Sequence, residues 1–234
     1  MARKPQRSRD TSKQPIALPP PGGTAREKII AAFMALLAEK RFENIGFGDI
    51  AARAGVALTD CREEFGSTLA ILAAHMKQLD RQVLGRSDAD MAEEPPRERL
   101  FDVLMQRIEA MTPHKEAVRS LMRSASCNPG LGIALNGLAV RSQAWMLTAA
   151  NIDAAGTRGA IRAQGLAMLF ASVLRTWLDD DDEGHARTMA ALDRALARGQ
   201  RWSGMLDDAC RFLPGHGRSR RRRRDEEEEE PKAA

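Results

Sequence analysis

Apolar residues recur at spacings of three and four along most of this chain, and this periodicity is the feature that most restricts its fold. Alanine and leucine dominate the apolar set, and only 4% of the residues are aromatic, which favours helices over sheets. No segment alternates polar and apolar residues as a half-buried strand would. No apolar run approaches the roughly 20 residues of a membrane span. The sequence therefore predicts an all-α protein.

The two ends of the chain differ in composition from its body. Residues 1–23 hold five prolines and five basic residues, and residues 214–234 hold an arginine block followed by an acidic block. Such segments cannot bury enough apolar surface to fold, so we predict a disordered basic arm and a disordered Arg/Glu tail. Residues 24–217 hold 24 basic and 25 acidic residues, so the net charge of +4 belongs to the ends.

The residue types that carry catalysis or bind metals form no recognisable motif. Cys61, Cys127 and Cys210 are odd in number and far apart, which argues against a disulfide scaffold and for a reducing cytoplasm. We find no nucleophile elbow, no phosphate-binding glycine loop and no histidine at metal-ligand spacing. The five consecutive acids of 179–183 are interpreted as a solvated loop. We therefore predict a cytoplasmic protein that is not an enzyme and holds neither a cofactor nor a metal.

The first predicted helices are short and closely spaced. Thr24 and Glu27 have capping-box spacing, which marks the start of the first helix. Gly55 permits a tight turn between the second and third helices, and that arrangement forms a helix-turn-helix. These helices are expected at about 24–41, 47–54, 58–65 and 67–84. Further helices are expected at about 96–111, 114–126, 129–150, 158–179 and 185–203, with an amphipathic piece ending at Leu213.

The order and spacing of residues in this first part resemble the N-terminal domain of the TetR family of bacterial transcriptional regulators. The matching stretches are Thr24-x-Arg26-Glu27-Lys28-Ile29-Ile30, Asp49-Ile50-Ala51, Ala54-Gly55-Val56 and Phe65-Gly66-Ser67. The resemblance implies a helix-turn-helix DNA-binding domain at 24–72 and a helical ligand-binding and dimerisation domain at 73–213. It also implies a homodimer, joined by the helices at 158–179 and 185–203, that binds a palindromic operator and is released by a small apolar ligand.

The resemblance makes the third helix the one that reads DNA. The candidate DNA-binding residues are Arg26, Lys28, Ala57, Leu58, Thr59, Arg62 and Thr68, of which Arg26 and Lys28 would contact the DNA backbone. At three of these positions the family usually has another residue: Ser or Thr where this chain has Ala57, Tyr where it has Arg62, and Lys where it has Thr68. The third helix holds three acids against one arginine, and residues 24–66 hold six basic and seven acidic residues. Since phosphates favour Lys and Arg, the sequence leaves open whether this domain binds DNA or is a structural remnant.

The C-terminal half holds flexible and bulky side chains that suit an adaptable ligand cavity or an ordinary core. The candidate ligand-binding residues are Met105, Met111, Met122, Trp145 and Met168. His75 and His114 are further candidates to line a pocket.

The layout of this half also resembles the TetR-like coenzyme Q assembly factors, which are lipid-binding proteins that do not read DNA. The similar stretches are Arg97-Glu98-Arg99-Leu100, Thr112-Pro113-His114, 162–174 and Arg175-Thr176-Trp177-Leu178-Asp179. This second resemblance implies an alternative function, a lipid-binding accessory protein of ubiquinone biosynthesis. Residues 202–213 would then touch a membrane. Packing of these residues on their own domain or on a partner subunit is the interpretation that we favour.

Overall fold

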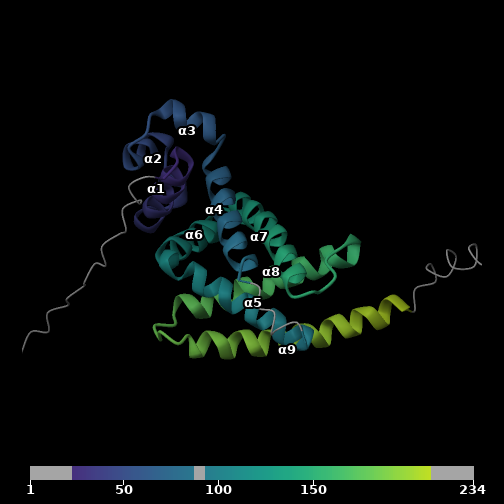
Figure 1. Cartoon of the computed structure of the whole chain (residues 1–234). Helices are drawn as coiled ribbons and strands as arrows, with labels where there is room; N and C mark the ends of the chain where they lie inside the picture. The colour runs from purple at the N-terminus through teal and green to yellow at the C-terminus, as the bar shows by residue number, and fades with distance from the viewer. Residues whose placement is uncertain (1–22, 87–92, 212–234) are drawn as a thin grey trace, which may run out of the picture. The chain divides into compact units, whose positions relative to one another are not determined.

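Helices account for the regular structure of this chain. The computed structural model describes residues 23–86 and 93–211, and the side chains of 23–86 and 93–199. Within these ranges it contains helices and no strand, which confirms the predicted all-α class (Figure 1). The predicted tail, and all but the last residue of the predicted arm, lie outside them. The helices are α1 (Ala25–Glu39), η1 (Phe42–Asn44), α2 (Phe47–Ala54), α3 (Leu58–Glu64), α4 (Thr68–Leu84), α5 (Pro96–Met111), η3 (Thr112–His114), α6 (Lys115–Cys127), α7 (Pro129–Ala149), α8 (Gly156–Leu178) and α9 (Ala186–Arg211).

The predicted start of the first helix is confirmed by its cap. The backbone N–H of Glu27 donates to the Thr24 hydroxyl at 3.3 Å, and the N–H of Thr24 donates to the Glu27 carboxylate at 2.9 Å. These two bonds satisfy donors that have no partner within the helix. The helix ends at Glu39, two residues before the predicted end, and the short turn η1 follows.

The predicted helix-turn-helix is also present. Helix α2 ends at Ala54, and Gly55 adopts a left-handed backbone with φ of 65° that turns the chain toward α3. A residue with a Cβ atom is strained in this conformation, which explains why glycine stands there. Helix α3 is short, and it begins at Leu58 as expected.

The chain divides into two compact units. Unit 1 comprises residues up to Gln82 together with Ala110–Leu138, and unit 2 comprises Val83–Glu109 together with the residues from Ala139 onward. Helices α4, α5 and α7 each contribute to both units. The boundary expected between residues 72 and 73 falls inside α4, and it remains a prediction about function.

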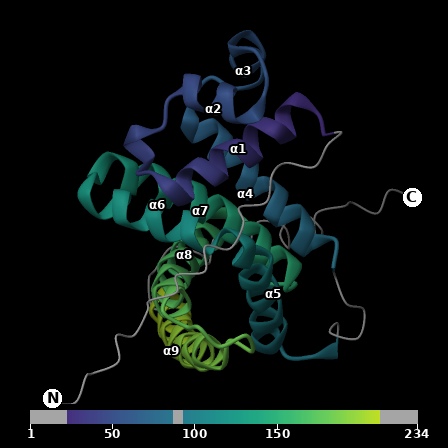
Figure 2. The same ribbon diagram turned by 90° about the vertical axis from the view of Figure 1, so that its left-hand side faces the viewer.

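Unit 1 is built around α1. Its side chains Ile29, Phe33 and Leu37 are fully buried, and α2, α3 and α6 pack against it (Figure 2). Two buried serines of α6 bond to the chain just after α1. The Ser120 hydroxyl donates to the Lys40 carbonyl at 2.8 Å, and the Phe42 N–H donates to the Ser124 hydroxyl oxygen at 3.2 Å. These bonds hold α6 against α1 where the first helix ends.

Unit 2 is dominated by α8 and α9, which lie side by side (Figure 1). Trp177 of α8 and Leu192 of α9 are fully buried, as are Leu104 of α5 and Met146 of α7. The predicted helix at 185–203 and the piece ending at Leu213 form one continuous helix as far as Arg211. None of the helices in the described part is both long and apolar enough to cross a membrane.

The interpretation of 179–183 as a solvated loop is wrong for one of its residues. Asp180 is 1% exposed, and its carboxylate accepts bonds from the Thr188 backbone N–H at 2.8 Å and the Thr188 hydroxyl at 2.6 Å. Burial alone would raise the pKa of Asp180. The hydrogen bonds from Thr188, together with a backbone hydrogen bond from Asp182 and the positive charge of Arg187, hold that pKa below its usual value. Asp180 therefore fastens the first turn of α9 to the loop after α8.

We predict that Asp180→Ala lowers the free energy of unfolding by about 2 kcal/mol, because a charged acceptor of two buried donors is lost. Glu183→Ala, which removes an exposed acid from the same loop, is the control and should change it by less than about 0.5 kcal/mol. Urea denaturation followed by circular dichroism measures both. The pKa of Asp180 is lower in the folded state than in the unfolded state. Its contribution to the free energy of unfolding is therefore complete above its ordinary pKa, and it is lost as the pH falls through the lowered pKa. Equal midpoints for the two variants would contradict the role of Asp180.

Candidate nucleic-acid interface

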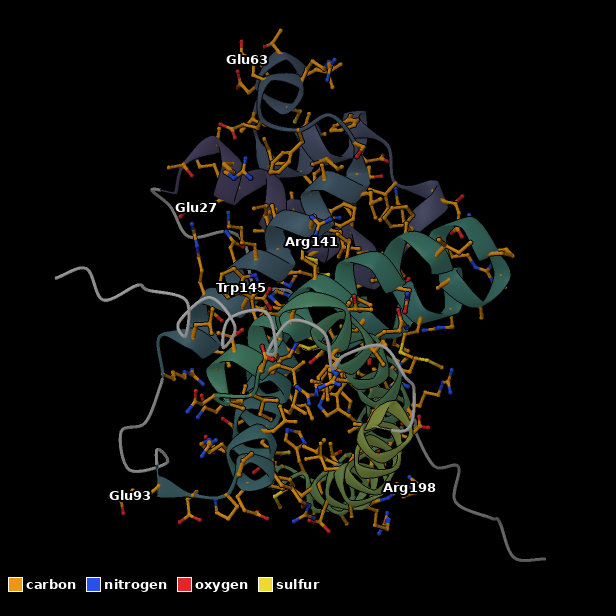
Figure 3. All side chains as sticks on the ribbon, turned by 90° about the vertical axis from the view of Figure 1, so that its right-hand side faces the viewer. Glu27, Glu63, Glu93, Arg141, Trp145 and Arg198 are labelled. Carbon is orange, nitrogen blue, oxygen red and sulfur yellow. The ribbon has the colours of Figure 1, made fainter. Side chains whose placement is uncertain are left out.

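The buried residue Cys61 defines the inward face of α3, and so determines which side chains of this helix point outward. Cys61 is fully buried, and Phe65 just after the helix is 4% exposed. With about 100° between successive residues, Thr59 and Glu63 lie about 160° from Cys61 and so point away from the core. Both are exposed, and Figure 3 shows the Glu63 side chain projecting from its helix. Burial raises the pKa of the Cys61 thiol, which keeps it a protonated core residue.

Four of the seven predicted DNA contacts share this exposed surface. They are Ala57, Leu58, Thr59 and Arg62, of which Leu58 is 57% exposed despite its apolar side chain. Thr68 and Lys28 are half-buried, on α4 and α1 respectively. These assignments stay predictions.

Three of the seven acids between residues 24 and 66 cap the starts of helices. Glu27 bonds to the N–H before α1, as described above. Asp49 accepts from the Gly46 N–H at 3.3 Å, and Asp60 accepts from the Ala57 N–H at 3.1 Å. The backbone hydrogen bond from Gly46, assisted by Lys40, lowers the pKa of Asp49. Each carboxylate lies beside the positive end of a helix dipole, where negative charge is stabilised.

Two more acids are neutralised by ion pairs. Arg53 binds Glu39 through two hydrogen bonds, at 3.0 and 2.8 Å, and this raises the pKa of Arg53. Arg26 donates to Glu64 at 3.0 Å. Glu43 and Glu63 are the two acids of this region that take part in none of these contacts. Net charge therefore misrepresents the outer surface of α3, where the consecutive residues Arg62 and Glu63 are both exposed.

Arg26 has a place that the sequence did not predict. Besides its bond to Glu64, its Cζ atom lies 4.6 Å from the centre of the Phe65 ring. One guanidinium thus joins the start of α1 to the end of α3 by an ion pair and a cation–π contact. Arg26 remains a predicted DNA contact, and in this structure it also fastens α3 to the start of α1. The long separation between Arg26 and Glu64 hid this pair from sequence analysis.

The candidate ligand-binding residues are divided between the units. Met105, Trp145 and Met168 belong to unit 2, and Met111 and Met122 belong to unit 1. Met105 and Met111 are buried, whereas Trp145 and Met168 are 53% and 66% exposed. The five therefore do not gather into one site within either unit.

Unit 2 buries polar side chains that sequence analysis missed. Arg107 of α5 is 3% exposed. Its Cζ atom lies 5.9 Å from the centre of the Phe170 ring, and its Nη1 atom lies 3.9 Å from the Met146 sulfur. Gln143 of α7 is 1% exposed, and its side-chain oxygen accepts no hydrogen bond from the described residues. A polar residue inside an apolar helix pattern was the signal that could have identified both.

His75 and His114 come together within unit 1. Their rings meet edge to face with centres 4.6 Å apart, and burial lowers the pKa of His114. This contact packs α4 against η3. In the part of the chain that the structure describes, no three His, Cys, Asp or Glu residues are grouped so as to hold a metal ion.

Comparison with known proteins identifies the fold. No protein-family model and no curated protein matches this chain. A TetR transcriptional regulator from Nitrosomonas europaea is 20% identical over 76% of this chain and 99% of its own, with a TM-score of 0.61. One from Rhodococcus sp. RHA1 is 20% identical over 75% of this chain and 94% of its own, with a TM-score of 0.51. The chain therefore has the fold of the TetR-family transcriptional regulators, as the sequence resemblance implied.

We predict that Arg26→Ala and Glu64→Ala each destabilise unit 1, by about 1 kcal/mol and about 0.5 kcal/mol. Arg26→Ala costs more because it also removes the contact with Phe65. The double variant should cost less than the two singles together, which measures the coupling. Arg26→Lys, which keeps the charge but not the planar group, should lie between wild type and Arg26→Ala. Thermal denaturation provides the comparison, and strictly additive effects would contradict the pair.

Proposed function

We propose that this chain is a TetR-type one-component transcriptional regulator, a homodimer that binds a palindromic operator through α3 and responds to a small apolar ligand. The observation that carries this proposal is the state of the carboxylates around the reading helix. Five of the seven acids in this region are engaged in caps or ion pairs. The exposed surface of α3 then offers Leu58, Thr59, Arg62 and Glu63, which suit contacts with base edges.

The proposed dimer face lies on α8 and α9. Ile161 and Met168 of α8 are 56% and 66% exposed, and their spacing of seven residues places them on one stripe. Gly165 lies between them, and a Cβ atom added there would meet nothing of this chain within 4 Å. Met189 of α9 is 38% exposed. Exposed apolar residues with a glycine among them support close packing by a second copy.

The proposed ligand site lies in the interior of unit 2. Its walls would be the apolar side chains around Met105, Met146 and Phe170, which are all buried. The buried side-chain oxygen of Gln143 would accept a hydrogen bond from a hydroxyl or amide of the ligand. These features support a mostly apolar molecule that carries a hydrogen-bond donor.

The alternative is a lipid-binding accessory protein that does not read DNA. It is favoured by the outward position of Glu63, because a carboxylate facing a phosphate surface weakens binding. Its proposed membrane contact at 202–213 falls where side chains are not described. Selection from random duplex DNA separates the two functions, since a DNA-binding regulator enriches a sequence and a lipid-binding protein does not.

We predict that the full-length protein enriches a palindromic site from random duplex DNA at physiological salt. Arg62→Ala should weaken binding to that site about 5- to 150-fold, the worth of a good arginine contact to guanine. The matched control is Arg41→Ala, which removes an exposed arginine from the same unit outside α3. Fluorescence anisotropy with the selected duplex gives both affinities. Failure to enrich any site, together with a co-purified isoprenoid lipid, would favour the accessory protein.

We predict that Met168→Asp converts the dimer to a monomer, because two like charges would be buried at the proposed face. Ile133→Asp is the control, since Ile133 is 76% exposed on α7 and lies outside that face. Light scattering at micromolar concentration measures the mass, and circular dichroism checks that both variants fold. A wild-type monomer, or a dimer that survives Met168→Asp, would contradict the assignment of α8.

A further inference from the structure

We propose that Glu63 is a base-reading residue that selects cytosine, while its neighbour Arg62 selects guanine. Each operator half-site would then contain a cytosine and a guanine contacted by adjacent residues of α3. This inference rests on the proposed function, and it assigns a purpose to the one acid that argued most strongly against DNA binding.

The position of Glu63 is the first argument. It lies about 160° around the helix from the buried Cys61, so it points away from the core that holds α3 (Figure 3). Among the charged residues of α3, Glu63 lies farthest around the helix from the buried side, so it faces the base edges when α3 enters a major groove with its outer face. A carboxylate there either repels the duplex or finds a hydrogen-bond donor on a base.

The surroundings of Glu63 form the second argument. The two other acids of α3 are held elsewhere, Asp60 by the Ala57 N–H and Glu64 by Arg26. Glu63 instead stands exposed next to the exposed Arg62. The pair leaves the outer face of α3 without net charge, so the penalty for approaching phosphates is confined to one carboxylate beside one guanidinium.

The chemistry of the major groove identifies the bases. A carboxylate can only accept hydrogen bonds, and the exocyclic amino group of cytosine is the donor that Glu and Asp contact in the major groove. Arginine presents paired donors that match the two acceptors of guanine. Leu58 and Arg62 are four residues apart, so the exposed Leu58 follows the same line along the helix and suits a thymine methyl group.

The two possible roles of Glu63, repelling phosphates or reading a base, predict different effects on DNA binding when its charge is removed. If Glu63 only repels phosphates, its neutral variant binds every sequence more tightly by one common factor. If Glu63 reads cytosine, the neutral variant loses discrimination at one position in each half-site. Glutamine has nearly the same shape and pairs well with adenine, so Glu63→Gln should move the preference at that position from cytosine to adenine.

The test is selection from random duplex DNA with the full-length wild type, Glu63→Gln and Glu43→Gln. Glu43→Gln is the charge-matched control, because Glu43 is an exposed acid of η1 outside the reading helix. We expect the wild-type motif to hold one cytosine per half-site that only Glu63→Gln changes. Anisotropy with the selected duplex and its cytosine-substituted form should show that the wild type discriminates about 5- to 150-fold and that Glu63→Gln loses this.

The outcomes separate this inference from the proposed function. An unchanged motif, with binding tightened equally by both variants, would overturn the role of Glu63 and leave a DNA-binding regulator in place. A motif enriched only by Glu63→Gln would show that this acid excludes DNA, which overturns the inference and the function of the natural chain together. No motif with any of the three proteins would refute DNA binding itself.

Discussion

The burial of α1 is the interaction on which unit 1 depends. Ile29, Phe33 and Leu37 are fully enclosed, and α2, α3 and α6 all pack on this one helix. Helix α3 has seven residues, too few to be stable alone, so its direction is set by what it packs on. Cys61 anchors α3 from within the core, and Arg26 fastens its far end. The outward direction of Glu63 is a consequence of those two attachments.

Carboxylates in unit 1 take three different roles that depend on their nearest partner. Asp49 and Asp60 accept hydrogen bonds from backbone N–H groups before α2 and α3, so their negative charge is partly offset by the positive end of a helix dipole. Glu39 and Glu64 are held by arginines. Glu63 stands beside Arg62 on the outer surface. A charge count treats these residues alike, whereas their effect on an approaching phosphate differs with the direction and pairing of each side chain.

Local signals in the sequence predicted the fold well, and long-range contacts escaped it. The cap at Thr24, the bounds of α2 and the left-handed Gly55 depend on residues within one turn, so their patterns can be read directly. Asp180 was misjudged because its partner, Thr188, lies across a turn in the next helix. Periodicity also marks Met105 and Met168 as similar, although one is buried and the other exposed. It cannot distinguish the core from a face that a second chain would cover.

Under the proposed function, the reading face of α3 and the apolar face of α8 depend on each other. Three of the six basic residues between 24 and 66 are engaged in ion pairs within the unit: Arg26, Lys40 and Arg53. One DNA-binding domain therefore has fewer basic residues available to phosphates than its sequence suggests, and we expect this to weaken its own binding to DNA. Joining two such domains through α8 makes the second contact intramolecular, which raises affinity without any new charge. A DNA-binding domain with few phosphate contacts gains its selectivity from contacts with base edges. It needs the second domain of the dimer to stay on the operator long enough for those contacts to form.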